Sequence, residues 1–157
     1  MTVKRESGLA QINTYLDETI SHTLDKYEKV KKKLPTIVSM LFIESPFRAP
    51  RHIDSAVDVL NLFDTDIVVA VRPEVGVFYQ HNGEGLQPVQ RSMGLRLEAD
   101  ELYRKVGGMQ TIRVEYFIKE RKSFGGRVGH IVLDEKSSLS LLTDWDWEIA
   151  EFICSQE

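Results

Sequence analysis

Cysteine is nearly absent from this sequence. Cys154 is the single cysteine among 157 residues, so no disulfide can form within the chain, and this composition suits a reducing, cytoplasmic compartment. The four histidines are scattered, and no Cys/His spacing resembles a zinc site. The basic pair Lys4 and Arg5 has no apolar run behind it, and no stretch reaches the ~18 apolar residues of a membrane-spanning helix. Neither a signal peptide nor a membrane partner is predicted.

The sequence also has no excess of basic residues. Lys and Arg number 20 against 24 Asp and Glu, a net charge of −4, which argues against a nucleic-acid partner. No P-loop, no dinucleotide-binding glycine motif and no Ser/His/Asp arrangement is present. The length, with 42% hydrophobic and 28% charged residues, is typical of one soluble globular domain.

Apolar periodicity in the first half predicts alternating helices and strands. Residues 9–31 carry apolar side chains at spacings of three and four, as in an amphipathic helix, and residues 53–63 repeat the pattern. The nearly continuous apolar runs 36–43 and 67–71 are typical of strands buried on both faces of a parallel sheet. Residues 36–71 are therefore predicted to form a βαβ unit with a right-handed crossover. Two strands do not complete such a sheet, so we expect a partner or a longer chain to supply more.

The second half has a different character. Asn82-Gly83 lies between the apolar stretches 77–80 and 86–89, which is a strong hairpin signal. The further elements expected are a short helix at 98–106, strands at 109–114 and 128–133, and a last helix from about Asp146. The prediction is one α/β domain over residues 1–157, with a hairpin insertion at about 74–96.

The loop 44–48 is the first candidate site. In open α/β sheets, ligands bind beyond the carboxyl ends of the strands, and this loop follows a predicted strand. Ser45 offers a hydroxyl, and Arg48 offers a planar fork for phosphate or carboxylate. A plain strand-to-helix turn with a surface arginine explains the same residues, and the loop alone does not decide between the two.

Two further clusters carry charge. The acids in 143–148 would suit a divalent cation, but they also open a helix, and we predict that Thr143 or Asp144 is its N-cap. Arg96 and Arg104 precede a Gly-Gly pair and could face an anionic ligand, although a small basic excess is usually solvated surface.

Taken in order, these segments resemble the acylneuraminate cytidylyltransferases, the CMP-N-acetylneuraminic acid synthetases. Residues 41–48, LFIESPFR, stand at the family's LQPTSPLR, and residues 53–56, IDSA, stand at its IDxA. The other matches are 67–71 at VVSV, the hairpin at 82–83, 106–110 at NGAIY, 126–129 at GGKIG, and 140–146 at DIDTExD. The resemblance covers nearly all of this chain and the C-terminal two-thirds of the family. The family's N-terminal strand and glycine-rich CTP loop have no match here.

The resemblance implies a fold, a reaction and partners. The fold would be a partial Rossmann-like nucleotidyltransferase sheet with an inserted hairpin that holds a homodimer. The family's reaction joins CTP and an N-acylneuraminate, an acidic sugar, into CMP-sugar and pyrophosphate with the help of Mg²⁺. The positions implied for substrate binding are Ser45, Arg48, Arg96 and Gly107.

Several family positions are altered. The sugar-contacting Gln, Asn and Tyr fall on Phe42, Val106 and Gln110, and the two metal-binding Asp fall on Ser140 and Leu142. A leucine cannot ligate Mg²⁺, so no metal ligand and no catalytic residue is assigned. Two hypotheses follow. One is a cytidylyltransferase-like domain that is inactive as this isolated chain, and the other is a non-catalytic sugar-binding or interaction module derived from the family.

Overall fold

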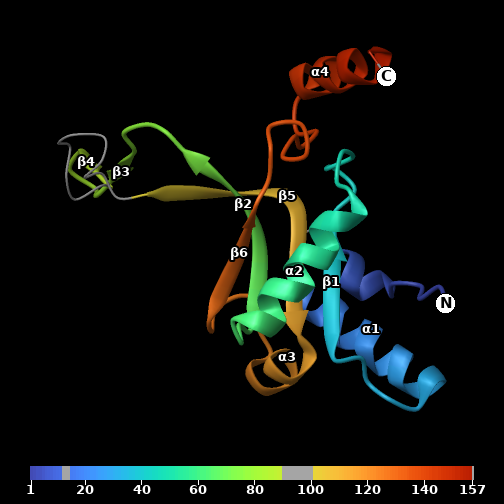
Figure 1. Cartoon of the computed structure of the whole chain (residues 1–157). Coiled ribbons are helices and arrows are strands. Elements are labelled where there is room, and N and C mark those ends of the chain that lie inside the picture. The colour runs from blue at the N-terminus through green and yellow to red at the C-terminus, as the bar shows by residue number, and fades with distance from the viewer. Residues whose placement is uncertain (12–14, 90–100, 157) are drawn as a thin grey trace. The chain divides into compact units, whose positions relative to one another are not determined.

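The computed structural model describes residues 1–11, 15–89 and 101–156. The elements in chain order are η1 (Ser7–Ala10), α1 (Leu16–Lys31), β1 (Ile37–Leu41), α2 (Pro50–Leu62), β2 (Ile67–Glu74), β3 (Tyr79–His81), β4 (Leu86–Pro88), β5 (Leu102–Arg113), α3 (Val114–Glu120), β6 (Val128–Val132) and α4 (Asp144–Ser155) (Figure 1). Within the described residues, no helix is both long and apolar enough to cross a membrane.

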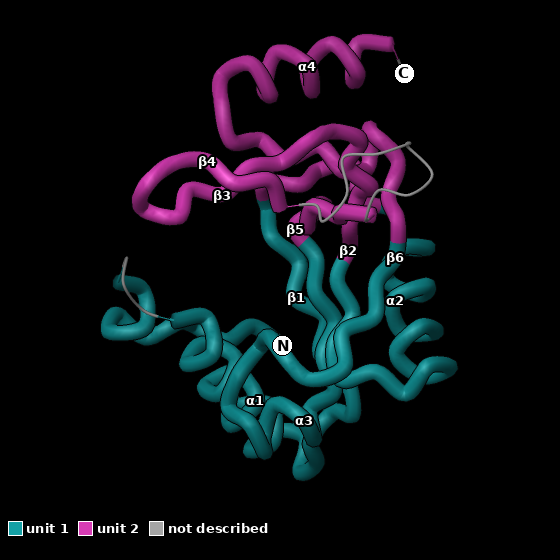
Figure 2. Tube along the Cα trace, turned by 90° about the vertical axis from the view of Figure 1, so that its left-hand side faces the viewer, with its two compact units in different colours: residues 1–43, 49–69, 109–131 teal, residues 44–48, 70–108, 132–157 magenta. Residues whose placement is uncertain are grey.

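The chain divides into two compact units, each built from three segments (Figure 2). Unit 1 comprises residues 1–43, 49–69 and 109–131, and unit 2 comprises residues 44–48, 70–108 and 132–157. Strands β2, β5 and β6 each pass from one unit into the other.

The central sheet has the strand order β1-β5-β2-β6. β1 and β5 are antiparallel, in a register that runs from Ile37 opposite Arg113 to Leu41 opposite Met109. β2 and β6 run in the same direction, because Asp66 N donates to Arg127 O at 2.9 Å before the two strands and Leu133 N donates to Val71 O at 2.9 Å farther along both. The sheet is therefore mixed, and the predicted α/β class is confirmed.

The predicted βαβ unit is present as β1, α2 and β2, but its two strands are not neighbours. β5 lies between them, and β1 is at the edge of the sheet. The expectation that residues 36–43 lie inside a parallel sheet is therefore wrong for this chain. An apolar run does not specify which strand lies beside it, and β1 is only partly buried, with Leu41 exposed, as is Ile43 just beyond it.

The expectation of a helix at 98–106 is also wrong. Leu102–Arg113 is one long strand, while 98–100 lie outside the described residues. The Gly-Gly pair does not end this strand: Gly107 and Gly108 have φ of +67° and +45°, and the strand continues through them. A Cβ on Gly107 would lie 2.4 Å from Leu133 Cδ1, so the bend needs a residue without a side chain.

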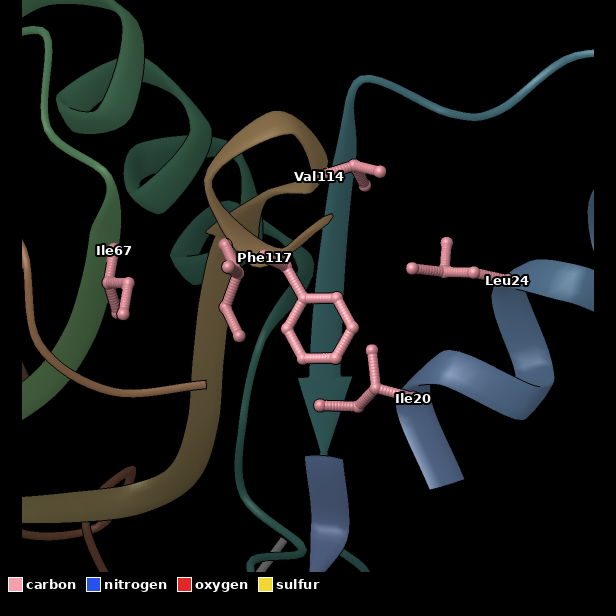
Figure 3. Packing of buried hydrophobic residues seen from close by; sticks show 6 residues of the cluster. Ile20, Leu24, Ile67, Val114 and Phe117 are labelled. Atoms are coloured by element: carbon pink, nitrogen blue, oxygen red, sulfur yellow. The ribbon is translucent and has the colours of Figure 1, made fainter. Parts of the chain in front are cut away.

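The core of unit 1 lies between α1, α3 and the sheet. α1 begins at Leu16, later than the expected residue 9, and it turns Ile20 and Leu24 inward. They pack with Phe117 of α3, which the sequence did not predict as a helix (Figure 3). The rest of this cluster comes from the strands and the start of α3: Ile67, Ile112 and Val114.

The predicted hairpin is confirmed in unit 2. β3 and β4 are antiparallel, with His81 opposite Leu86. Asn82 Oδ1 accepts hydrogen bonds from the N–H groups of Glu84 at 3.0 Å and Gly85 at 2.9 Å, and Gly83 takes a φ of +102°. Because these bonds join residues only two and three positions apart, the Asn-Gly pair is sufficient to predict where the turn lies.

Candidate functional site

Unit 2 brings together three of the four residues expected to bind substrate. The Ser45 hydroxyl lies 3.0 Å from the Ser140 hydroxyl. Arg48 Nη1 donates to the carbonyl oxygens of Gly107 at 3.0 Å and Gly108 at 3.2 Å. The loop after β1 is thus attached both to the bend in β5 and to the segment that leads into α4.

These bonds give the loop a structural role as well as a chemical one. Ser45 is buried, and its hydroxyl is directed at another hydroxyl. Arg48 is part-buried and holds the carbonyls of the bend, where the backbone takes positive φ. Leu141 N donates to Glu44 O at 2.7 Å, which adds a backbone bond to the same junction. The fourth candidate, Arg96, lies outside the described residues.

A cavity of about 250 Å³ lies in the same unit. Its walls come from the carboxyl end of β2, from the amino-terminal part of β5, and from the segment that leads from β6 into the first turn of α4. The lining residues are Arg72, Arg104, Lys105, Val106, Glu135, Ser138, Leu139, Ser140, Leu142 and Asp146. We call this cavity the unit 2 pocket.

The cations of the unit 2 pocket differ in how they are neutralised. Arg104 Nε lies 2.8 Å from Glu74 Oε1, so this guanidinium already has a carboxylate. The Arg72 side chain is half-buried, and no hydrogen bond or ion pair joins its guanidinium to any residue in the described ranges. Burial lowers the pKa of Lys105. Within the described ranges, the Arg72 guanidinium is therefore available to an anionic group.

Three residues of the pocket are not among those that the sequence predicts for a site: Arg72, Lys105 and Glu135. A signal existed for Arg72, because it directly follows the apolar run 67–71, at the strand end where ligands of α/β proteins bind. Lys105 fell inside the wrongly expected helix, and Glu135 stood in no recognised motif.

The resemblance matches Ser140 and Leu142 to the family's metal-binding Asp residues, and the structure describes both. Ser140 has its hydroxyl against Ser45, while Leu142 is 76% exposed. In the described part of the chain, no group of three or more His, Cys, Asp or Glu residues could hold a metal ion.

Thr143 is the N-cap of α4. The sequence predicts either Thr143 or Asp144 for this position, and the structure selects Thr143. Its Oγ1 accepts from Asp146 N at 3.2 Å, and Asp146 Oδ2 accepts from Thr143 N at 2.8 Å. Asp144 is the first helical residue and is not the cap. The hydrogen bonds from the Thr143 hydroxyl, the Thr143 N–H and the Leu142 N–H lower the pKa of Asp146, since they favour its ionised form.

No family model matches the chain, and no curated protein matches it either. Solved structures do match, and one of them is 2-C-methyl-D-erythritol 4-phosphate cytidylyltransferase from Thermus thermophilus. The two structures superpose with a TM-score of 0.55 and 11% sequence identity, over 98% of this chain and 78% of the other. The chain therefore has a cytidylyltransferase-like fold. At this identity the likeness is one of fold, and it does not distinguish the acylneuraminate members from other cytidylyltransferases.

Proposed function

We propose that the chain is a cytidylyltransferase-like domain that binds an acidic sugar in the unit 2 pocket and does not transfer a nucleotide by itself. The observation that carries this proposal is Arg72. A half-buried guanidinium without a protein partner in the described ranges, in a pocket that Ser138 and Ser140 also line, suits a ligand that has one carboxylate and several hydroxyl groups.

The volume of the pocket limits the ligand. About 250 Å³ is below the roughly 300–1,000 Å³ of typical ligand pockets, so one sugar fits better than a complete nucleotide-sugar. Glu135 and Asp146 contribute carboxylates to the same walls, and carboxylates accept hydrogen bonds from sugar hydroxyls. The proposed ligand is therefore the acidic sugar, in agreement with the resemblance to the acylneuraminate family.

The missing carboxylates support the second half of the proposal. The family's reaction is attack of a sugar hydroxyl on the α-phosphate of CTP, and a metal ion stabilises the charge that develops as pyrophosphate leaves. Ser140 and Leu142 stand where the resemblance places the metal-binding Asp, and the Ser140 hydroxyl already faces Ser45. We therefore expect purified chain with CTP, N-acetylneuraminate and Mg²⁺ to release no pyrophosphate above background. Release above background would contradict this.

Calorimetric titration tests the sugar site. N-acetylneuraminate is expected to bind the wild type, and Arg72→Met should weaken binding about tenfold or more, since a hydrogen bond to a charged group contributes about 1.5–3 kcal/mol. Arg51→Met removes an exposed arginine of α2 in unit 1 and should leave binding unchanged. No binding to the wild type, or equal loss in both variants, would refute the sugar site.

The hairpin favours an additional role in self-association. Its apolar side chains are all exposed in the single chain, namely Val77, Phe78, Tyr79, Leu86 and Val89. A two-stranded hairpin is at best marginally stable in water, and exposed apolar patches of this kind mark interfaces. We propose that residues 77–89 hold a two-fold homodimer, in which the same patch is buried on both copies.

Light scattering on the wild type and on two variants tests the homodimer. Phe78→Asp should yield monomers, while Phe63→Asp, a matched change at the exposed end of α2 in unit 1, should leave the dimer intact. A wild-type monomer at tens of micromolar would end the dimer proposal. A dimer that survives Phe78→Asp would move the interface elsewhere.

A further inference from the structure

The loop of residues 44–48 is attached to two walls of the unit 2 pocket. One wall is formed by residues 104–106 of β5, which come directly before the bend of that strand, and we call it the β5 wall. The other is the segment 138–142, between β6 and α4, and we call it the Ser140 wall. Loop and walls all belong to unit 2. None of the described residues 44–48 is among those that line the pocket, so this loop acts on the pocket from behind its walls.

Arg48 holds the bend in β5 through one nitrogen atom. Its Nη1 donates to Gly107 O at 3.0 Å and to Gly108 O at 3.2 Å. In an extended strand, successive carbonyl groups point in opposite directions, so one donor does not reach two in a row. Here both carbonyls lie on the side of Arg48, because Gly107 and Gly108 leave the extended conformation with φ of +67° and +45°. The guanidinium therefore binds a backbone shape that only the bend provides.

The other end of the loop is attached to the Ser140 wall. The Ser45 hydroxyl, in a residue that is 2% exposed, lies 3.0 Å from the Ser140 hydroxyl. Beside it, Leu141 N donates to Glu44 O at 2.7 Å. Hydrogen bonds at both ends of one short loop thus join the two walls.

Without Arg48, the Gly-Gly pair would be a hinge in β5. Glycine adopts positive and negative φ about equally readily, so Gly107 and Gly108 do not hold one bend angle by themselves. A hydrogen bond from a charged donor is roughly twice as strong as a neutral one, so the guanidinium is well suited to restrain this hinge. The β5 wall comes directly before the hinge, and its position therefore depends on the bend angle.

We propose that Arg48 is a positioning residue of the unit 2 pocket. By holding the carbonyls of Gly107 and Gly108, it fixes the β5 wall relative to the Ser140 wall and so sets the width of the pocket. The inference rests on the proposed function, in which this pocket binds an acidic sugar. Arg48 acts through the bend, in place of the direct substrate contact that the resemblance implies for it.

Two substitutions at Arg48 separate positioning from direct contact. Arg48→Met removes the donor and keeps a side chain of similar reach. Arg48→Lys keeps a charged donor, and its ammonium group can serve both carbonyls, because the observed contact uses a single nitrogen. Lysine does not reproduce the planar fork with which arginine binds a carboxylate. Rescue by lysine is therefore expected of a positioning residue and not of a residue that binds the sugar carboxylate.

Calorimetric titration of the full chain with N-acetylneuraminate measures the effect on the pocket. Arg48→Met should weaken binding about tenfold or more, the factor expected on loss of a hydrogen bond from a charged group. Arg48→Lys should stay within about threefold of the wild type, since it retains the charged donor. Arg51→Met, in unit 1, is the matched control and should bind like the wild type.

Carbon-13 NMR of the glycine carbonyls tests the same bonds without a ligand. The chain has ten glycines, so glycine labelling gives a small set of signals to assign. A hydrogen bond moves a carbonyl signal downfield, so Arg48→Met should move the signals of Gly107 and Gly108 upfield, while Arg48→Lys should retain them. Gly85 is the internal control, because its carbonyl accepts from Asn82 N inside the hairpin and should not move.

The outcomes distinguish failure of this inference from failure of the proposed function. If the wild type does not bind N-acetylneuraminate, the sugar site is refuted, and unchanged Gly107 and Gly108 signals in Arg48→Met would then refute the positioning role as well. If the wild type binds and Arg48→Met binds equally tightly, the sugar site stands and the positioning role is overturned.

A third outcome would assign direct contact to Arg48. In it, Arg48→Lys retains the glycine signals but loses as much affinity as Arg48→Met, which overturns the positioning role. Circular dichroism checks that each variant is folded. If Arg48→Met is not, Arg48→Gln replaces it with the same expected loss of affinity.

Discussion

The two units differ in what they do with their apolar side chains. In unit 1, α2 turns Ala56 and Leu60 completely away from solvent, and α1 buries Ile20 and Leu24. In unit 2, the twelve residues of α4 bury only Ala150. Its large apolar residues Trp145, Trp147 and Phe152 are exposed, like those of the hairpin.

This difference distinguishes apolar residues that stabilise the fold from apolar residues that remain exposed and can contact a partner. Burial of apolar surface stabilises a fold, whereas contiguous exposed apolar surface marks a place where something binds. Unit 1 buries a core cluster, although it also exposes single large apolar residues such as Phe63 and Phe124. Unit 2 combines the unit 2 pocket with the exposed apolar side chains of the hairpin and α4.

Truncation of one phenylalanine in each unit should give the largest difference in stability between them. Phe117 in unit 1 is 1% exposed and Phe152 in unit 2 is 66% exposed. Phe117→Ala should lower the free energy of unfolding by about 3–5 kcal/mol, because it opens a cavity in the core. Phe152→Ala should change it by no more than about 0.5 kcal/mol. Urea denaturation measures both, and equal losses would contradict the distinction between the units.

The bend in β5 provides a stability test inside unit 2. Gly107→Ala should cost about 1–3 kcal/mol, because its φ of +67° disfavours a side chain and the new Cβ would meet Leu133. Gly85→Ala is the control, since its Cβ would meet nothing within 4 Å. If the two variants are equally stable, the positive φ and the missing side chain at Gly107 are not required for stability.

The N-cap of α4 should have a smaller effect. Thr143→Ala removes the side-chain acceptor of the Asp146 N–H and should cost about 1 kcal/mol. Asp144→Ala, one residue later, removes no cap bond and should cost less, about 0.3–1 kcal/mol from the helix dipole. Thermal melts with and without Mg²⁺ measure both. A melting temperature that Mg²⁺ raises in the wild type but not in Asp144→Ala would indicate a metal site instead.

The smallest effect is a dependence on pH. The pKa of Asp146 is lowered in the folded chain, so its stabilising contribution is present above the unfolded-state pKa and is lost as the pH falls through the folded-state pKa. The difference in melting temperature between wild type and Asp146→Ala should therefore be full at neutral pH and shrink in acid. A difference that is constant between neutral and acidic pH would exclude ionisation of Asp146 as its cause.

The features that depend on neighbouring residues can be predicted from the sequence. Asn82-Gly83 located the hairpin turn, because the Asn side chain bonds to backbone only two and three residues away. Thr143 was among the expected caps for the same reason, since its partner Asp146 is three residues away. The spacing of apolar residues likewise predicted α2 and the two apolar strands around it.

The order of the strands and the position of the pocket depend instead on how distant segments pack. β5 bonds to β1 across more than 60 residues of sequence, and no local pattern specifies that β5 separates β1 from β2. Arg72, Lys105 and Ser140 line one cavity although they are far apart in the chain. Ser45 and Arg48 were identified by their type and position, but their partners Ser140 and Gly107 come from other segments. Local bonds are encoded within a few residues, whereas cross-strand bonds and shared cavities depend on how distant segments pack.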